Sequence, residues 1–291
     1  MIYNSALDWQ NAVQKRVVLF GMSGLGKTHV SNMLRASGDW FHYSIDYRIG
    51  TRYMGEFIED SFKREAMGNP FLRDLLMSDS IKIKSNMTFD NLAPLSTYLG
   101  KPGRADKGGL SIEEYRRRQA QHHRAEVEAL LDTPYFIERA RHIYGYDHFV
   151  CDSGGSICEV VDPADPNDPV LSCLSQSALM VWIEGSDAHI DELIKRFDRA
   201  PKPMCYQASF LDAKWEAYLA QHGVAASDVD PDNFVRWTYA QAMAHRQPLY
   251  SGMANWGVKV TADEVAAVKT PDQFDVMIAN ALERSTQPLY L

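Results

Sequence analysis

The sequence predicts an α/β protein built on a central parallel β-sheet of about five strands. Apolar runs of strand length alternate with stretches of helical patterning, which is typical of parallel sheets covered on both faces. The five runs are Val17–Phe20, Phe41–Ile45, His148–Cys151, Leu179–Ile183 and Gly257–Thr261. A glycine-rich turn also joins the first run to a helix, as expected of a ligand-binding loop in such a fold.

The composition is that of a globular protein with ample core: 45% of the 291 residues are hydrophobic and 23% are charged. The formal net charge of −8 argues against coating nucleic acid by bulk electrostatics, although a local basic patch is compatible with it. No apolar run reaches the length of a membrane span, and the first residues do not have the pattern of a signal or transit peptide. Because the four cysteines form no C-x-x-C pair, we expect reduced thiols and a cytoplasmic location.

The glycine-rich turn reads Gly21-Met-Ser-Gly-Leu-Gly-Lys-Thr28 and matches the P-loop pattern G-x-x-x-x-G-K-T. Glycines let successive N–H groups face one anion, and the helix N-terminus adds partial positive charge. Lys27 would neutralise the β- and γ-phosphates of ATP, and Thr28 would offer its hydroxyl to Mg²⁺. A glycine turn between a core strand and a core helix is the alternative, and the flanking strand and helix favour the P-loop. The predicted cofactor-binding residues of this segment are Gly21, Ser23, Gly24, Leu25, Gly26, Lys27, Thr28 and His29.

Acidic residues and glycines follow the second and third runs, where an α/β fold places its ligands. Asp46 is predicted to orient or deprotonate the hydroxyl of a phosphate acceptor, with a helix N-cap as the alternative. Asp152 is predicted to hold Mg²⁺ through water. Gly154 and Gly155 would let the backbone approach a substrate closely, unless the segment is a plain strand-to-helix turn.

Two further segments are basic. Arg196, Arg199 and Lys202 surround a helix end marked by two prolines, and they would close over ATP as a lid, with Arg196 binding the nucleotide and Arg199 acting in catalysis. A second helix is predicted from 111 to about 131, and its Arg117 and Arg124 lie on roughly one face, from which both reach a carboxylate or phosphate. For both segments a solvated charged face is the alternative. In the second helix that face would be balanced by Glu126 and Glu128.

Residues 49–110 are too long for one crossover helix and are rich in glycine and proline. We interpret them as a mostly helical insertion near the acceptor site, ending in a mobile stretch at Gly100–Gly109. The predicted core is then 1–48 together with 111–291.

Taken in order, these motifs resemble shikimate kinase and its relatives among the small P-loop kinases. The resemblance covers residues 15–48 and 111–285. It rests on the P-loop and on five shorter segments that are similar to family motifs in the same order. Ser44-Ile-Asp46 is similar to Asp-x-Asp, and Ser111-Ile-Glu-Glu114 leads to His123-Arg124-Ala-Glu-Val-Glu128, which is similar to a Phe-Arg-x-x-Glu segment. Ser153-Gly154-Gly155 is similar to three glycines, Lys202-Pro203-Met204 to the lid's Arg-Pro-Leu, and Arg246-Gln-Pro-Leu-Tyr250 with Ala254 to Arg-x-x-Leu-Tyr…Ala.

The resemblance implies a three-layer α/β/α P-loop NTPase fold, ATP and Mg²⁺ as cofactors, and phosphoryl transfer to a hydroxyl. It also implies that Arg124 and Arg246 hold an anionic group of the acceptor. Ser44 stands where the family has a carboxylate that helps to hold Mg²⁺, so Asp152 would take over that task. Because the insertion would lie between two acceptor-contacting elements, the resemblance does not imply that shikimate is the acceptor.

Three hypotheses for function follow. The first is an ATP- and Mg²⁺-dependent kinase that phosphorylates a hydroxyl of a small, anionic metabolite. The second places the acceptor hydroxyl on a nucleotide or a nucleic acid, with the basic helix and the insertion forming the binding channel. The third is a non-catalytic or regulatory ATP-binding or ATPase module, which the serine at position 44 keeps open.

Overall fold

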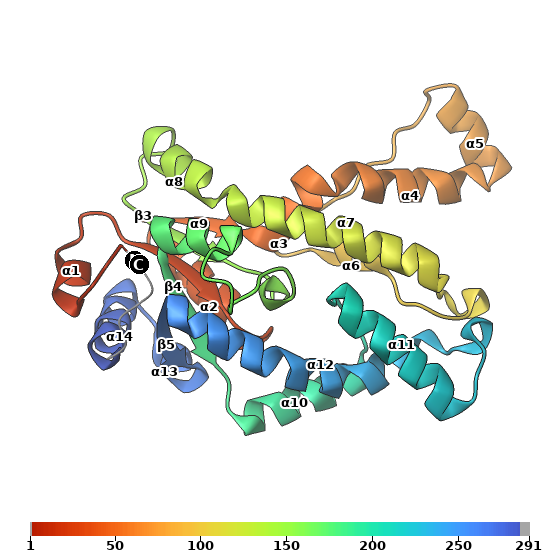
Figure 1. Ribbon diagram of the computed structural model, residues 1–291. Coiled ribbons are helices and arrows are strands. Elements are labelled where there is room, and N and C mark those ends of the chain that lie inside the picture. Colours follow the sequence, from red (N-terminus) through yellow and green to blue (C-terminus); the bar gives the residue numbers. More distant parts are fainter. Residues whose placement is uncertain (1, 286–291) are drawn as a thin grey trace. The chain divides into compact units, whose positions relative to one another are not determined.

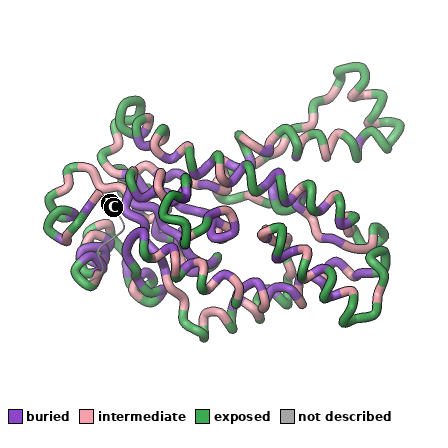
Figure 2. The backbone as a smooth tube through the Cα atoms, in the orientation of Figure 1, coloured by how far each residue is buried: buried purple, intermediate pink, exposed green. Residues whose placement is uncertain are grey.

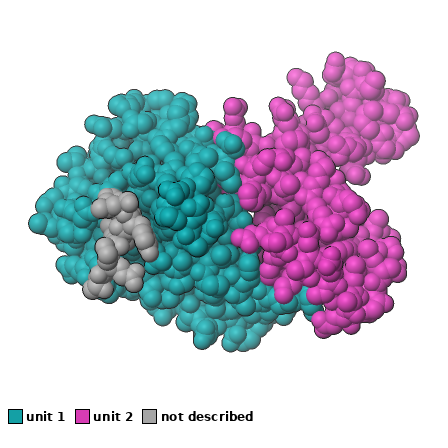
Figure 3. Space-filling view, viewed as in Figure 1, with its two compact units in different colours: residues 1–45, 127–200, 236–291 teal, residues 46–126, 201–235 magenta. Residues whose placement is uncertain are grey.

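The computed structural model describes residues 2–285, and the chain divides into two compact units (Figure 3). Unit 1 comprises residues 1–45, 127–200 and 236–291, and unit 2 comprises residues 46–126 and 201–235. Unit 2 thus holds the segment 49–110 together with parts of the chain that the sequence assigns to the core. The predicted partition into a core and an insertion remains a prediction.

Unit 1 contains a five-stranded sheet in which all neighbouring strands are parallel (Figure 1). The strand order is β2-β3-β1-β4-β5. The α/β fold class, with helices flanking a parallel sheet, is confirmed, and each strand begins and ends within one residue of its predicted bounds. The strands are β1 (Arg16–Phe20), β2 (Trp40–Ser44), β3 (His148–Asp152), β4 (Leu179–Glu184) and β5 (Gly257–Thr261).

The strand order locates a topological switch point between β1 and β3. In the strand order, β1 and β3 are neighbours. The connection after β1 runs past β3 to β2, whereas the connection that leads to β4 runs from β3 past β1 in the opposite direction. In open α/β sheets, ligands bind at the carboxyl ends of two adjacent strands whose connections diverge in this way. The ends of β1 and β3 are therefore the expected ligand site of unit 1.

Most helices of unit 1 begin at a capping side chain or a proline. Asp168 accepts hydrogen bonds from the backbone N–H groups of Val170 and Leu171, and a proline occupies the first helical position after it. The helices are α1 (Ala6–Asn11), α2 (Lys27–Ala36), α8 (Thr133–His142), α9 (Pro169–Ser177), α10 (Asp187–Arg199), α13 (Ala262–Ala267) and α14 (Pro271–Arg284), with short 3₁₀ turns at Ile157–Glu159 and Ala254–Trp256.

Unit 2 is helical apart from its loops. The Ser111 hydroxyl accepts from the N–H of Glu114 and caps the predicted long helix, whose C-terminal end at residue 131 is also as expected. The helices are α3 (Ile45–Arg48), a π-helical turn (Ile49–Tyr53), α4 (Gly55–Met67), α5 (Pro70–Met77), α6 (Ala93–Leu99), α7 (Ile112–Leu131) and α11 (Ala208–His222), with 3₁₀ turns at Ala105–Lys107 and Ala226–Asp228. Boundaries between the units fall inside α3, inside α7 and inside α12 (Pro231–Met253).

The glycine-rich stretch at Gly100–Gly109, expected to be mobile, is tied down in unit 2. Lys101 and Lys107 form ion pairs of 2.6 Å with Asp232 and Asp230, and the N–H of Arg104 donates to a backbone carbonyl at position 229. These partners lie 131 and 123 residues away along the chain, so local composition does not indicate them.

No helix among residues 2–285 is long and apolar enough to cross a bilayer.

The packing of α14 on the sheet provides a test of the core of unit 1. Phe274 is fully buried and meets the edge of Trp40 of β2 with 5.7 Å between ring centroids. We expect Phe274→Ala to lower the free energy of unfolding by about 3–5 kcal/mol, because it leaves a cavity in a close-packed site. On the same helix, Val276 is 59% exposed, so Val276→Ala should change stability by less than about 0.5 kcal/mol. Urea denaturation followed by circular dichroism measures both, and equal effects would contradict the packing.

Candidate active site

The loop between β1 and α2 has backbone angles that favour glycine. Gly21, Gly24 and Gly26 have φ values of 140°, 88° and 98°, which other residues rarely adopt. A Cβ atom on Gly21 would also lie 2.5 Å from the carbonyl oxygen of Ile183, so a side chain would collide with β4. Gly26 is the N-cap residue of α2. The predicted P-loop therefore has the form of an anion-binding turn at a helix N-terminus.

Lys27 holds its ammonium group against this loop. Lys27 is only 6% exposed, and its Nζ donates hydrogen bonds to the carbonyl oxygens of Gly21 at 2.7 Å and Met22 at 2.9 Å. The next two residues, Thr28 and His29, are exposed in the first turn of α2, as is Ser23 in the loop, whereas Leu25 is buried. The ammonium group of Lys27 therefore lies at the loop, and Thr28, which carries the hydroxyl, is the next residue in the sequence.

Arg196 of α10 lies beside the P-loop. A Cβ atom built on Gly24 would come within 2.9 Å of Nη2 of Arg196 and 3.0 Å of Cδ2 of Leu193. The structure thus brings together two residues that the sequence predicts as nucleotide-binding. Arg199 is the last residue of the same helix and is exposed.

The helix that carries these arginines is packed on α12. Phe197 stacks on Tyr239 with 3.8 Å between ring centroids, and Nε of Arg236 donates to the carbonyl oxygen of Asp198 at 2.9 Å. A stacked ring pair and a hydrogen bond from a charged group both fix the helix, so α10 presents Arg196 from a supported position.

The glycine pair after β3 meets the P-loop at the switch point. A Cβ atom on Gly155 would lie 2.4 Å from Oγ and 3.2 Å from the backbone nitrogen of Ser23. Beside it, the hydroxyl of Ser153 donates to the carbonyl oxygen of Leu19 in β1 at 2.8 Å. The two loops therefore approach each other closely enough to explain the glycine at position 155.

Asp152 ends β3, with Leu19 of β1 and Ser44 of β2 opposite it in register. Its carboxylate is buried and lies 3.8 Å from Nε2 of His42, which is also buried. Sequence reasoning missed His42, although strand alternation places it on the same face of β2 as Ser44. Asp152 thus lies at the carboxyl ends of the strands, where a carboxylate that helps to hold Mg²⁺ would be expected.

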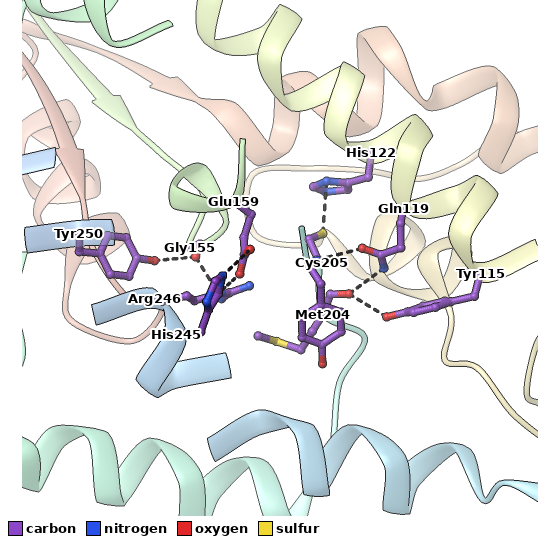
Figure 4. Close-up of polar contacts among 11 residues, drawn as sticks. Tyr115, Gln119, His122, Gly155, Glu159, Met204, Cys205, His245, Arg246 and Tyr250 are labelled. Carbon is purple, nitrogen blue, oxygen red and sulfur yellow. Dashed lines mark hydrogen bonds and ion pairs between the residues drawn. The ribbon is translucent and has the colours of Figure 1, made fainter. Parts of the chain in front are cut away.

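Arg246 of α12 supports the Gly155 loop through a buried ion pair (Figure 4). Its Nε donates to Oε1 of Glu159 at 2.6 Å and its Nη1 donates to the carbonyl oxygen of Gly155 at 3.2 Å. The hydroxyl of Tyr250 donates to the same carbonyl at 2.6 Å. Burial is the largest single influence and opposes the charged form, but the attraction of Glu159 together with that of Cys158 and Tyr250 raises the pKa of Arg246.

These contacts bear on the expectation that Arg246 holds the acceptor. At least two of its donor nitrogens are used inside unit 1, so its observed role is to fix the loop that contains Gly155. Sequence reasoning missed Glu159, because the two residues are 87 positions apart and no local pattern pairs them.

The remaining predicted residues lie in unit 2, whereas the P-loop lies in unit 1. Asp46 is the second residue of α3 and is half-buried, and Arg124 is exposed on α7. Arg117 donates two hydrogen bonds of 2.7 Å to Glu114, and these bonds lower the pKa of Glu114 to about 2. Arg117 is therefore paired within its own helix, and it and Arg124 are both exposed, seven residues apart on α7.

Two neighbouring arginines of α7 are paired as well, since Arg116 meets Asp212 at 2.8 Å and Arg118 meets Glu114 at 2.7 Å. Glu126, expected on the solvated face, is fully buried, so that expectation is wrong for this residue. Carboxylates are rarely buried in proteins, which is why residue type alone placed it outside.

The buried face of α7 forms hydrogen bonds with the segment that follows Pro203. Gln119 donates to the carbonyl oxygen of Met204 at 2.8 Å and accepts from the N–H of Tyr206 at 3.0 Å (Figure 4). Nδ1 of His122 lies 3.2 Å from Sγ of Cys205, and burial lowers the pKa of His122 to about 4, so the ring is neutral at pH 7. This contact surface was also missed, because its two halves are about 85 residues apart.

The residues of unit 1 fit a nucleotide with a bound cation. The glycine cradle, the α2 N-terminus, Lys27 and Arg196 suit polyphosphate oxygens. The Thr28 hydroxyl and the Asp152 carboxylate are oxygen ligands of the kind that Mg²⁺ prefers. Within residues 2–285, no group of three or more His, Cys, Asp and Glu side chains could hold a metal.

The Arg246–Glu159 pair makes a specific prediction about stability. Arg246→Met should lower the free energy of unfolding by about 3–5 kcal/mol, because it removes the arginine that binds the buried carboxylate of Glu159. Adding Glu159→Met should recover most of the loss, since two apolar side chains replace two desolvated charges. Urea denaturation of the two variants beside wild type tests this. Additive losses in the double variant would show that the pair is not coupled.

No model of a known protein family and no curated protein matches this chain. Among solved structures, it is similar to a shikimate kinase from Bacteroides thetaiotaomicron, with 15% identity, 93% of this chain and 95% of that chain covered, and a TM-score of 0.35. It is also similar to a shikimate kinase from Aquifex aeolicus, with 15% identity, 79% and 97% coverage, and a TM-score of 0.27. The fold class rests on the chain's own parallel sheet.

Proposed function

We propose that this chain is an ATP- and Mg²⁺-dependent phosphotransferase that moves the γ-phosphate to a hydroxyl of a small, anionic metabolite. The observation that carries the proposal is the P-loop at the switch point of the sheet, with Arg196 beside Gly24 and Gly155 against Ser23. A loop of this form, with the charged side chains of Lys27 and Arg196 beside it, is suited to binding and polarising a polyphosphate.

The proposed roles follow from position and chemistry. Lys27 and the loop amides bind the β- and γ-phosphates, and Thr28 and Asp152 hold the metal. Bound Mg²⁺ neutralises charge on the phosphate oxygens and keeps them in place. Arg196 and Arg199 meet the charge that develops on the transferring phosphoryl group.

On the acceptor side, Asp46 takes the proton of the attacking hydroxyl. The hydroxyl oxygen forms a bond to the γ-phosphorus while the bond between that phosphorus and the oxygen that leaves with ADP breaks. Gly154, Gly155 and Arg124 are the proposed acceptor contacts. Arg246 contributes through the Gly155 carbonyl that it binds.

The ion pairs of α7 favour a small acceptor over nucleic acid. Arg116, Arg117 and Arg118 each meet a carboxylate within unit 2, which reduces the positive charge that this helix offers to a phosphate backbone. The net charge of −8 acts in the same direction.

A transfer assay with γ-labelled ATP and Mg²⁺ tests the proposal, run against a metabolite extract and separately against nucleic acid. We expect label in a small anionic product, and Lys27→Ala should reduce its formation by about 10²-fold or more, because it removes the main phosphate cation. Lys269→Ala is the matched control, since this lysine is exposed outside the loop. Label in polymer would favour the nucleic-acid hypothesis. Nucleotide binding with only phosphate release, or with no reaction, would favour a regulatory module or an ATPase.

The assigned base makes a separate prediction. Asp46→Asn should lower kcat by about 10²–10⁴-fold, because an amide does not accept the hydroxyl proton, while the affinity for ATP stays within a few-fold. Asp90→Asn, at an exposed position of the same unit, should leave both unchanged. Steady-state kinetics with the identified acceptor and calorimetric titration of ATP measure the two effects. A kcat within a few-fold of wild type would remove Asp46 from the mechanism.

A further inference from the structure

The hairpin formed by α4 and α5 carries an uncovered apolar surface. Of the eleven large apolar side chains exposed within residues 2–285, four belong to this hairpin: Phe57 (44% exposed), Met67 (36%), Phe71 (71%) and Met77 (74%). No residue of α5 is buried, and Figure 2 shows the hairpin mostly in the colours of exposed and intermediate residues. Such a concentration of exposed apolar side chains is typical of an interaction site.

One face of α4 is turned away from the rest of unit 2. The helix buries Ile58 and Ala66, which lie on one side of it. Four of its six exposed residues, at spacings of three, four and three, form one stripe along the opposite side, because a helix repeats every 3.6 residues. The stripe consists of Phe57, Asp60, Arg64 and Met67.

The order of chemistry along this stripe is self-complementary. Phe57 and Met67 lie five positions on either side of residue 62, and Asp60 and Arg64 lie two positions on either side of it. An antiparallel copy of the same helix, related by a two-fold axis near residue 62, therefore sets each apolar end against the other apolar end and each charge against its opposite. Interfaces of this isologous kind are the commonest in soluble oligomers.

We propose that this chain forms a two-fold symmetric dimer in which α4 packs antiparallel against α4 of a second copy. Phe57 of one copy contacts Met67 of the other, and Asp60 of one copy pairs with Arg64 of the other. Asp60 also pairs with Lys63 within its own helix at 3.0 Å, so a second cation would extend an existing ion pair. The apolar ends supply most of the free energy and the charges set the register, because exposed ion pairs alone contribute little.

The charge of the hairpin favours a second copy over other occupants. Residues 55–77 contain five acidic and three basic side chains, a balance that does not attract an anionic membrane or a nucleic acid. A surface with both charges in mirrored positions instead matches itself.

Sedimentation velocity on the full chain, from about 1 to about 100 µM, tests the dimer. We expect a concentration-dependent shift from monomer to dimer. Asp60→Arg or Arg64→Asp alone should weaken the dimer at least about tenfold, because each sets like charges against each other across the axis. The double variant Asp60→Arg/Arg64→Asp should restore association, since the opposite charges face each other again. Glu65→Arg is the matched control, an exposed reversal on the same helix about a third of a turn from the stripe.

Circular dichroism of each variant establishes that the exposed changes leave the fold intact. A chain that stays monomeric over the whole range would overturn the proposal. So would a dimer that the single reversals do not weaken, or a double variant that fails to recover. Higher oligomers would also contradict it, because an isologous two-fold contact closes at two copies.

Discussion

The close approach of two glycine loops at the carboxyl ends of β1 and β3 is the constraint on which the candidate site of unit 1 depends. Gly155 leaves no room for a side chain against Ser23, so the loop after β3 must be held firmly to keep the P-loop in shape. That support comes from α12, whose Arg246 and Tyr250 both donate to the Gly155 carbonyl. Glu159 in turn fixes Arg246. A buried ion pair adds little net stability, and here its main effect is to set the position of a backbone segment.

The sheet and the P-loop could be predicted because their causes are local. Strands such as β1 and β4 are buried on both faces and read as continuous apolar runs, so they are recognisable without knowledge of their neighbours. The P-loop pattern fixes Gly21 and Gly26, and the structure places positive φ at both, as well as at Gly24, which stands at a variable position of the pattern. Sequence and backbone therefore agree where one short segment determines both.

The rest could not be predicted because it depends on pairing between distant segments. Arg246 has an ordinary position in a helix until Glu159 is brought to it from 87 residues away, and the glycine-rich stretch near Lys101 is anchored by Asp232 in the same manner. Glu126 shows the opposite error, in which a carboxylate assigned to solvent by its type is fully buried. In each case the residue type was informative about chemistry, whereas its partner, which decides its role, lies outside any sequence window.

The position of Lys27 illustrates how such local and distant effects combine at the site. Its ammonium donates to two carbonyls of the P-loop, which keeps a buried cation hydrogen-bonded and close to the glycine turn. A phosphate group is an anion whose charge is shared among its oxygens, and charge-assisted bonds are about twice as strong as bonds to a neutral acceptor. In the proposed complex with ATP, exchanging a carbonyl acceptor of Lys27 for a phosphate oxygen would therefore be favourable. Since the lysine is already at the loop, little side-chain entropy remains to be lost when an anion binds, so the contacts that stabilise the loop also preorganise it.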